Sequence, residues 1–278
     1  MTSLSLPITS LARRAQLQFL PMIDGRIAWR RFGTGAPLVL LHGGHGSWLH
    51  WVRNIDALRE AGHTVLVPDM PSFGDSDALA GDPHAPDRLA RLVDALDGSL
   101  DGLLGTGERV GLVGFSFGGL AAATWAQRRP RFRRLALLGP AGHGSRRRPR
   151  AALQDWRLDD PAARHAALRH NLEAHMIADP QRVDELALAV HEAACAGTRF
   201  RSKELSLKAS LHDALRGIDI PVLTIFGEHD VTATPSDAIG SLALRNPDSR
   251  GTIVPDAGHW VQFECAAVVN RALVDWFA

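Results

Sequence analysis

The first candidate for chemistry in this sequence is a serine set between closely spaced glycines. Ser116 stands in the run Gly114-Phe115-Ser116-Phe117-Gly118-Gly119, after the apolar stretch Val110–Val113 and before an alanine-rich stretch. Glycines two residues before and two residues after the serine allow a strand and a helix to approach each other around a tight turn, which presents the hydroxyl group. The pattern therefore predicts a nucleophilic serine at a strand-to-helix turn.

The serine needs partners, because its hydroxyl is a poor nucleophile at neutral pH without an imidazole base, and the base needs a carboxylate. Candidates for both follow Ser116 in the chain. Asp230 lies on a loop just after an apolar run, and Glu228, two residues earlier, is the alternative acid. His259 lies on a loop after the last apolar run, later than any other histidine that could end a strand. The order Ser116, Asp230, His259 predicts a catalytic triad with His259 as the base.

Short apolar runs that alternate with helical patterns must position these residues. Buried strands are predicted at Leu38–Leu41, Val65–Val67, Val110–Val113, Leu135–Leu138 and Val222–Ile225, a last strand at Thr252–Val254, and helices at Trp48–Ala61, Pro86–Leu104 and Gly118–Arg129. Two further runs, Gln18–Met22 and Arg26–Phe32, are joined by an Asp-Gly pair that predicts an antiparallel hairpin. This alternation is typical of a doubly wound α/β fold with a mostly parallel sheet.

The alternation stops between residues 143 and 216, where the pattern is helical only. Asp160-Pro161 and Asp179-Pro180 each place an N-cap acid before a proline, and Gly197 is placed to end the second of these helices. The sequence therefore predicts a core of residues 1–142 and 217–278 with a helical cap, residues 143–216, inserted over the carboxyl ends of the strands. Open α/β sheets bind their ligands at that edge.

With these motifs in place, the sequence resembles the capped serine hydrolases of the α/β-hydrolase superfamily. The resemblance rests on Leu41-His42-Gly43-Gly44, on the run Pro68-Asp69-Met70-Pro71-Ser72-Phe73-Gly74-Asp75-Ser76, on the serine turn, and on the acid and histidine loops. It implies Asp230 as the acid, and an oxyanion hole formed by the N–H groups of Phe117 and Gly44, with His45 as a second candidate for the upstream donor. We also expect His45, Phe115 and Trp260 to bind substrate.

The sequence specifies the catalytic residues more clearly than it specifies which type of bond they cleave. The loop Gly258-His259-Trp260-Val261-Gln262-Phe263-Glu264 is similar to that of the hydrolases that cleave carbon–carbon bonds in ring-fission products, but that subgroup usually carries Asn where this chain has Phe115. Such a reaction would also need a carboxylate-binding arginine, for which Arg199 and Arg201 are the candidates. We therefore expect a small carboxylic ester as substrate, with carbon–carbon cleavage and a non-catalytic ligand receptor as the alternatives.

Composition limits the partners of the chain. Its 278 residues carry 31 Lys and Arg against 30 Asp and Glu, a net charge of +1, which favours neither nucleic acid nor an anionic membrane. We interpret the run Arg146-Arg147-Arg148-Pro149-Arg150 as a solvated hinge, with attraction of an anionic substrate or a nucleic acid as the alternative. Two cysteines cannot form a disulfide framework, and the first residues do not resemble a secretory leader. The expectation is a cytoplasmic enzyme acting on a small molecule, with a homo-oligomer left open.

No cofactor or metal is expected from the sequence. The three histidines within residues 42–50, taken with Asp69, match no zinc-ligand spacing. His191-Glu192 resembles the start of a metalloprotease helix motif, but Cys195 occupies the position of the second ligand. Haloalkane dehalogenases and epoxide hydrolases use an aspartate at the turn, where this chain has Ser116, so both families are excluded. Epoxide hydrolases also need cap tyrosines, and this chain contains no tyrosine.

Overall fold

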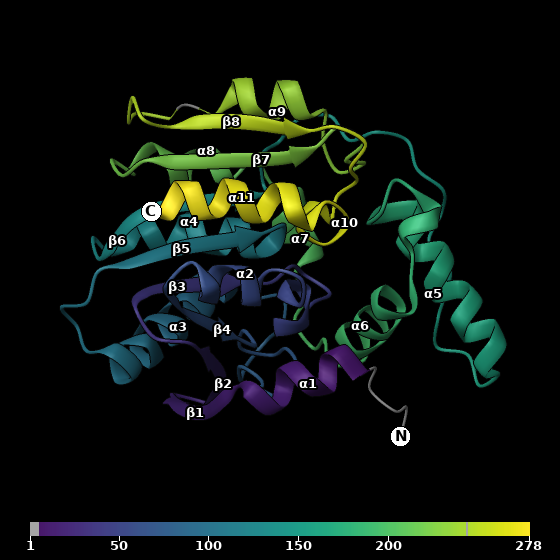
Figure 1. The fold of residues 1–278 in the computed structure, drawn as a ribbon, viewed down its shortest axis with the longest axis horizontal. Helices are drawn as coiled ribbons and strands as arrows, with labels where there is room; N and C mark the ends of the chain where they lie inside the picture. The colour runs from purple at the N-terminus through teal and green to yellow at the C-terminus, as the bar shows by residue number, and fades with distance from the viewer. Residues whose placement is uncertain (1–5, 243) are drawn as a thin grey trace.

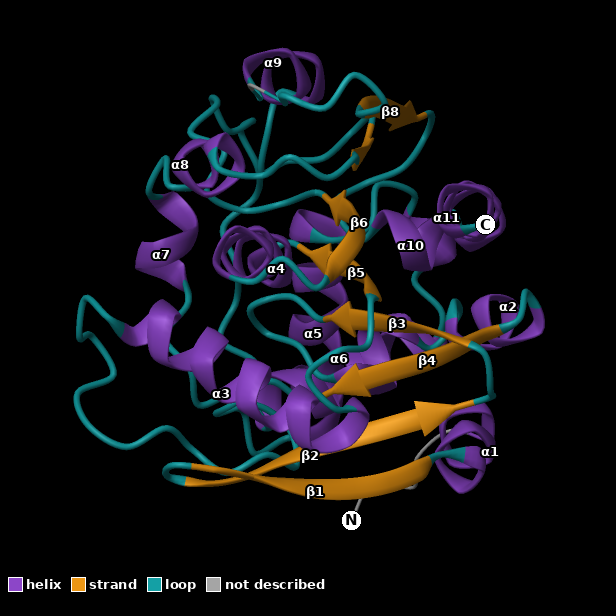
Figure 2. Cartoon of the chain, turned by 90° about the vertical axis from the view of Figure 1, so that its left-hand side faces the viewer, coloured by secondary structure: helices purple, strands orange, loops and turns teal. Residues whose placement is uncertain are grey.

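The computed structural model describes residues 6–242 and 244–278, and an eight-stranded sheet forms its centre. The strands lie in the order β1-β2-β4-β3-β5-β6-β7-β8 (Figures 1 and 2). Their bounds are β1 Gln16–Met22, β2 Gly25–Phe32, β3 Ala36–Leu41, β4 His63–Pro68, β5 Val110–Phe115, β6 Phe132–Leu138, β7 Val222–Gly227 and β8 Arg250–Val254. Each strand that the sequence predicts is therefore present.

Pairing within the sheet follows the predicted pattern. β1 and β2 form the antiparallel hairpin, and β2 also pairs antiparallel with β4. All pairs from β4 across to β8 are parallel. Every residue of β4, β5 and β7 is buried, as expected for parallel strands covered on both faces. The mostly parallel, doubly wound α/β sheet is thus confirmed.

Helices cover both faces of this sheet (Figure 2). Their bounds are α1 Leu6–Arg14, α2 Ile55–Glu60, α3 Arg88–Leu104, α4 Phe117–Arg128, α5 Pro161–His175, α6 Glu185–Ala196, α7 Lys203–Leu207, α8 Leu211–Arg216, α9 Pro235–Ser241, α10 Val261–Glu264 and α11 Ala266–Phe277. Buried side chains of α1, α2 and α11 belong to one apolar cluster, and those of α3, α4 and α8 to a second on the opposite face. Among the described residues, no helix combines the length and apolar character needed to cross a membrane.

The predicted helix Trp48–Ala61 is wrong in one respect, because it is broken in the middle. A short 3₁₀ helix spans Trp48–Trp51, and α2 begins only at Ile55. The break lies at Asn54, whose side-chain amide donates to the carbonyl of Gln262 at 2.9 Å and to the side chain of Asn270 at 2.7 Å. Contacts with a distant segment therefore override the local helical pattern.

The segment between β6 and β7 lies at the carboxyl ends of the strands, where α5 and α6 stand beyond the strand arrowheads (Figure 1). Asp160 caps α5 by accepting the N–H of Ala163 at 2.8 Å, as predicted. Asp179 instead caps a 3₁₀ turn, Pro180–Arg182, and Asp184 caps α6. Residues 146–159 form no regular element, and α8 packs against α4 of the core. The division into core and cap at residues 143 and 216 remains a prediction.

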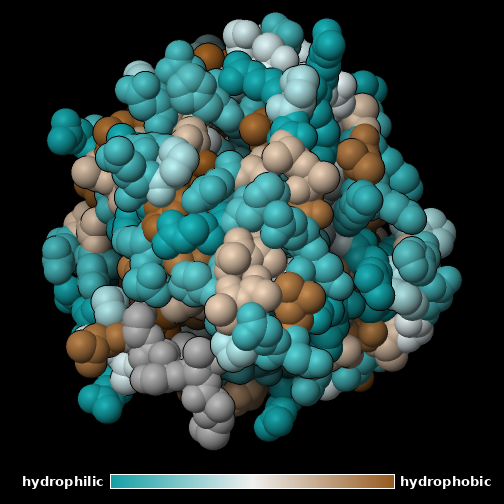
Figure 3. All heavy atoms as spheres, turned by 90° about the vertical axis from the view of Figure 1, so that its right-hand side faces the viewer, coloured by the Kyte–Doolittle hydropathy of each residue, from teal (hydrophilic) through white to brown (hydrophobic). Residues whose placement is uncertain are grey.

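The outer face of this segment is solvated. Figure 3 shows hydrophobic side chains scattered among hydrophilic ones on the side of the molecule where α5 and α6 lie. Leu153 and Leu158 are among the large apolar side chains that remain exposed in the described chain.

Candidate active site

Ser116 occupies the turn between β5 and α4 with a strained backbone. Its φ of 53° and ψ of −118° lie in a region that residues other than glycine rarely adopt, at a cost of about 1–3 kcal/mol. A Cβ atom on Gly114 would overlap the carbonyl of Gly118, and one on Gly118 would overlap the carbonyl of His42. The two glycines therefore permit the close approach of strand and helix, and the predicted strand-turn-helix is confirmed.

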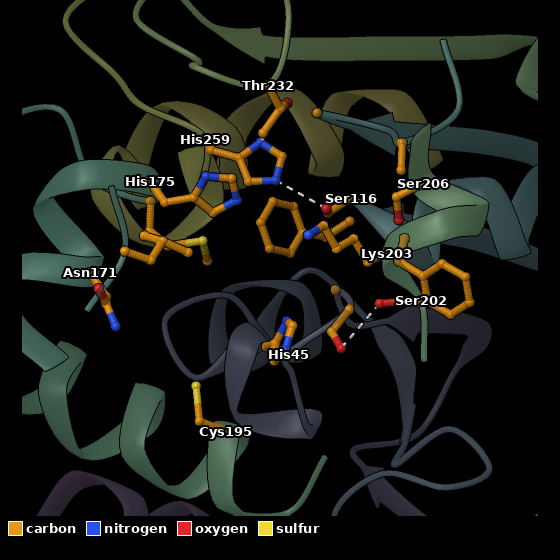
Figure 4. Close-up of a pocket in the computed structure, with 18 of the residues that line it drawn as sticks. His45, Ser116, Asn171, His175, Cys195, Ser202, Lys203, Ser206, Thr232 and His259 are labelled. Atoms are coloured by element: carbon orange, nitrogen blue, oxygen red, sulfur yellow. Dashed lines mark hydrogen bonds between the residues drawn. The ribbon is translucent and has the colours of Figure 1, made fainter. Parts of the chain in front are cut away.

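The turn presents the hydroxyl of Ser116 to His259 (Figure 4). Ser116 Oγ lies 3.0 Å from His259 Nε2, and His259 Nδ1 lies 2.8 Å from Asp230 Oδ2. Asp230 follows β7 and His259 follows β8, so the parallel strands bring both to the edge where β5 delivers the serine. Glu228, the alternative acid, is exposed and accepts the N–H of Asp256 instead.

Hydrogen bonds around Asp230 determine where His259 carries its proton. Thr232 donates both its backbone N–H and its hydroxyl to Asp230 Oδ1, each at 2.7 Å. Burial alone raises the pKa of Asp230, but the charge and hydrogen bond of His259, together with Thr232, outweigh it and lower this pKa below its usual value. An ionised carboxylate can only accept, so Nδ1 of His259 carries the proton and Nε2 is free to take the one on Ser116.

Thr232 and Gly139, which the sequence analysis missed, position Asp230 and His259: Thr232 hydrogen-bonds Asp230, and Gly139 leaves space for both side chains. Thr232 stands two residues after the acid, a spacing typical of side chains that close local turns, and this was the available signal. Gly139 follows β6 with a φ of +45°, and a Cβ atom there would lie 3.0 Å from Asp230 Oδ2 and 3.1 Å from His259 Nδ1. A side chain at position 139 would therefore crowd the two catalytic candidates.

The backbone at the two expected oxyanion donors lies close together. Phe117 is the first residue of α4, so its N–H group has no acceptor within the helix. A Cβ atom on Gly44 would lie 3.5 Å from Cβ of Phe117, and both residues line the cavity in front of Ser116. Ser202, at the start of α7, reaches the carbonyl of Gly44 at 3.5 Å (Figure 4). This placement suits an oxyanion hole, whose role remains a prediction.

A cavity of about 340 Å³ opens in front of these groups and contains two of the three expected substrate-binding residues. His45 and Phe115 line it, and the Phe115 ring lies 5.0 Å from that of His259. Trp260 does not line the cavity. Its side chain is fully buried, stacks on Phe263 at 4.1 Å and donates Nε1–H to the carbonyl of His50. The position of Trp260 therefore does not match the expected substrate contact, since its ring packs on Phe263 and beside His50.

The basic residues at the cavity differ from those expected. Arg199 donates to the carbonyl groups of residues 74, 76 and 197, and neither Arg199 nor Arg201 lines the cavity. Arg147, Arg150 and Lys203 do, although their side chains are exposed at its mouth. The arginine run is therefore more than a solvated hinge. The charge of the run was the available signal, but its position at the cavity depends on an irregular segment that only tertiary contacts place.

Further polar lining comes from histidines that burial keeps neutral. Burial lowers the pKa of His143 and of His191 to about 4 and that of His175 to about 3, and it lowers the pKa of His50 well below its usual value. His50 accepts the N–H of Gly43 at Nδ1, at 3.2 Å. The interior of the cavity thus combines apolar side chains with uncharged histidines, while its mouth is positively charged.

Other residues of the predicted motifs hold loops. His42 accepts the N–H of Met70 at Nε2. Asp69 accepts the N–H of Trp48 and forms an ion pair with Arg30 at 2.9 Å. These bonds fix the loops after β3 and β4.

The one group of possible metal ligands that comes together within residues 6–242 and 244–278 is Glu228, His229 and Asp256. Their ligand atoms lie within 4.8 Å of one another on the exposed surface. Exposed acidic groups commonly lie this close without binding a metal, and the cluster is separate from the cavity.

Comparison with known proteins places this geometry in a family. Residues 36–266 match the family model described as the alpha/beta hydrolase fold. The chain belongs to the α/β-hydrolase family. The resemblance stated from the motifs is therefore confirmed, and so is the expectation of an enzyme of this family.

Individual α/β-hydrolases are similar over nearly the whole chain. A 2-hydroxy-6-oxo-6-phenylhexa-2,4-dienoate hydrolase from Burkholderia cepacia is 30% identical over 91% of both chains. A 2-hydroxy-6-oxononadienedioate/2-hydroxy-6-oxononatrienedioate hydrolase from Comamonas testosteroni is 28% identical, also over 91% of both. The crystal structure of a carboxylesterase from Bacillus subtilis superimposes with a TM-score of 0.74 at 19% identity, covering 98% of this chain and 96% of that one, which shows a shared fold.

Proposed function

We propose that this α/β-hydrolase is a serine hydrolase that cleaves a small carboxylic ester through an acyl-enzyme on Ser116. The observation that carries the proposal is the continuous chain of contacts from Ser116 Oγ to His259 Nε2 and from His259 Nδ1 to Asp230. A serine, an imidazole and a carboxylate in this order form the unit that activates a hydroxyl for attack on a carbonyl carbon.

The steps follow from the positions of these groups. His259 takes the proton of Ser116 as Oγ attacks the ester carbonyl, and it gives the proton to the departing alcohol. The N–H groups of Gly44 and Phe117 stabilise the oxyanion that forms, a contribution of about 3 kcal/mol for each donor by analogy with other oxyanion holes. His259 then activates a water molecule, which releases the acid and restores Ser116.

Carbon–carbon cleavage of a ring-fission dienoate is the second candidate, and two observations favour it. Two relatives are named as hydrolases of dienoates or related polyenoates, which carry carboxylates. Arg147, Arg150 and Lys203 supply positive charge at the mouth of the cavity, where a carboxylate could bind. The same Ser116 would attack a ketone carbonyl in that case.

Steady-state kinetics with one substrate of each class decide between the two. We expect 4-nitrophenyl butanoate to give a higher kcat/KM than 2-hydroxy-6-oxo-6-phenylhexa-2,4-dienoate, and Ser116→Ala to abolish both activities. Arg147→Ala and Arg150→Ala should change ester turnover by less than about tenfold, as should the control Arg199→Ala, which lies outside the cavity.

A faster, Ser116-dependent turnover of the dienoate that is lost in Arg147→Ala or Arg150→Ala would make carbon–carbon cleavage the better assignment. Failure of a fluorophosphonate to label Ser116, together with no turnover of either substrate, would instead favour a non-catalytic ligand receptor.

A further inference from the structure

His175 is a polar residue beside the proposed catalytic pair for which the triad chemistry has no role. It ends α5, lines the cavity, and its ring centre lies 5.5 Å from that of His259, with an angle of 50° between the planes. Figure 4 shows the two rings side by side at the edge of the pocket, with Ser116 on the far side of His259. His259 must face the leaving group in order to protonate it, and His175 lines the same cavity beside His259.

The backbone next to His175 is tied to the loop that carries His259. Met176 accepts the N–H of Trp260 at 2.7 Å. The buried carboxylate of Glu264 accepts the N–H of Asp179 at 2.9 Å and that of Gly258 at 2.7 Å, and so joins the turn after α5 to the residue before His259. His175 is therefore held at a fixed position relative to the proposed base.

Neither ring nitrogen of His175 has a hydrogen-bond partner among residues 6–242 and 244–278, and Nδ1 is fully shielded from solvent. Its neighbours in the cavity differ in this respect. One turn earlier on α5, Asn171 exchanges two hydrogen bonds with the backbone of Gln154, at 2.8 and 2.9 Å. His143 contacts the hydroxyl and the N–H of Ser145. Of these three residues, His175 is the one with no hydrogen bond to the described protein, and its Nε2 is the nitrogen left for a ligand.

The charge state of His175 suits a neutral ligand group. Burial, followed by the charges of His259 and Arg150, lowers the pKa of His175 to about 3. The ring therefore stays neutral when His259 takes a proton during the reaction, and it does not compete for that proton. A neutral imidazole with no protein partner can take either tautomer, so it can donate to an ether or carbonyl oxygen or accept from a hydroxyl.

We propose that His175 is a specificity-determining residue that hydrogen-bonds an oxygen carried by the leaving group of the substrate. This inference rests on the proposed serine hydrolase reaction, because that reaction defines which part of the substrate lies against His259. The preferred substrates are then esters of oxygen-bearing alcohols.

Two esters of one acid test this preference, since their alcohols differ by a single atom. In 2-methoxyethyl butanoate an ether oxygen replaces one methylene of butyl butanoate, and kcat/KM, which includes the acylation step, is measured by pH-stat titration. Each rate is divided by the rate of alkaline hydrolysis of the same ester, which removes the intrinsic difference in reactivity. We expect the protein to prefer the methoxyethyl ester by about tenfold after this correction.

His175→Phe keeps an aromatic ring but removes both nitrogens, and it should abolish the preference mainly by slowing the methoxyethyl ester. His165→Phe is the matched control, because His165 is exposed on the same helix and lies outside the cavity, and it should leave the preference unchanged. An unchanged preference in His175→Phe, or an equal loss for both esters, would overturn the proposal.

Binding of the same two esters to Ser116→Ala separates this inference from the proposed reaction. Calorimetric dissociation constants should favour the methoxyethyl ester in Ser116→Ala, and the advantage should vanish in Ser116→Ala/His175→Phe. Absence of ester turnover and of fluorophosphonate labelling in the unmodified protein would reject the hydrolase proposal, while the binding constants would still decide the role of His175. Equal dissociation constants for both esters in Ser116→Ala would reject that role.

Discussion

Replacement of Glu264 by glutamine tests how the histidine loop is held. Glu264 is 7% exposed, and its two carboxylate oxygens accept the N–H groups of Ala178, Asp179 and Gly258 at 2.7 to 3.1 Å. In Glu264→Gln one oxygen becomes an NH₂ group, so at least one backbone N–H loses its acceptor and faces another donor. The remaining hydrogen bonds also lose their charged acceptor.

The size of the effect follows from these bonds. A hydrogen bond to a charged group contributes about 1.5–3 kcal/mol and a neutral one about 0.5–1.5 kcal/mol. One lost bond, at about 1.5–3 kcal/mol, and one or two bonds weakened by about 1–1.5 kcal/mol each give a destabilisation of about 2.5–6 kcal/mol. For a chain of this size we expect Tm to fall by roughly 5–24 °C, at about 2–4 °C for each kcal/mol.

Thermal unfolding followed by circular dichroism at pH 7 measures this change. Glu173→Gln is the control, because Glu173 is an exposed residue of the neighbouring helix α5 and its contact with Arg169 is 3.9 Å long. It should change stability by less than about 0.5 kcal/mol. If Glu264→Gln lowers Tm no more than Glu173→Gln does, Glu264 does not hold the loop in the way described.

The remaining predictions concern the acid, the space around it and the buried histidines. Asp230→Asn should lower kcat about 10³-fold or more in ester hydrolysis, because an amide can donate to Nδ1 and favours the wrong imidazole tautomer; near-normal turnover would refute this. Gly139→Ala should lower kcat/KM at least tenfold, since its Cβ would crowd Asp230 on a backbone with positive φ. Gly102→Ala has open space on α3 and should instead raise the free energy of unfolding by about 0.5–1 kcal/mol. The same kcat/KM and the same urea unfolding curve for the two variants would count against this. Stability should fall as pH drops below about 6.5, because burial lowers the pKa of His143 and His191 to about 4 and the unfolded chain then binds more protons than the folded one. Each of these two histidines should lower the free energy of unfolding by about 2 kcal/mol at pH 5. Urea unfolding at pH 7 and pH 5 should show a smaller loss of stability in His191→Gln than in the unmodified protein. An equal loss in the two proteins would be inconsistent with this prediction.

The elements that deliver the triad candidates could be predicted because their signals are local. The apolar run of β5 and the glycines around Ser116 specify a strand, a turn and a helix within a few residues of each other. Asp230 follows the continuous apolar run of β7, and His259 follows the shorter run Thr252–Val254 in β8. Parallel strands end at one edge of a sheet, so the fold itself brings these loops together.

His45 and Phe115 line the cavity as expected, but the rest of its lining depends on where segments without a local pattern are placed. Residues 146–159 form no helix or strand, yet they bring Arg147 and Arg150 to the mouth of the cavity. Trp260 is adjacent to His259 in sequence, but its side chain packs on Phe263 and does not line the cavity. Glu264 is visible in the histidine loop, but two of its three partners, Ala178 and Asp179, lie about 85 residues earlier in the chain.

The central claim is that Ser116 attacks the substrate and becomes acylated. Rapid mixing with 4-nitrophenyl butanoate, acid quenching and peptide mass spectrometry measure this directly. The account predicts a butanoyl group on the peptide that contains Ser116, formed within one turnover, much more slowly in His259→Gln and not at all in Ser116→Ala. Continued ester turnover in Ser116→Ala, or a butanoyl group attached to a different residue at the rate of turnover, would contradict it.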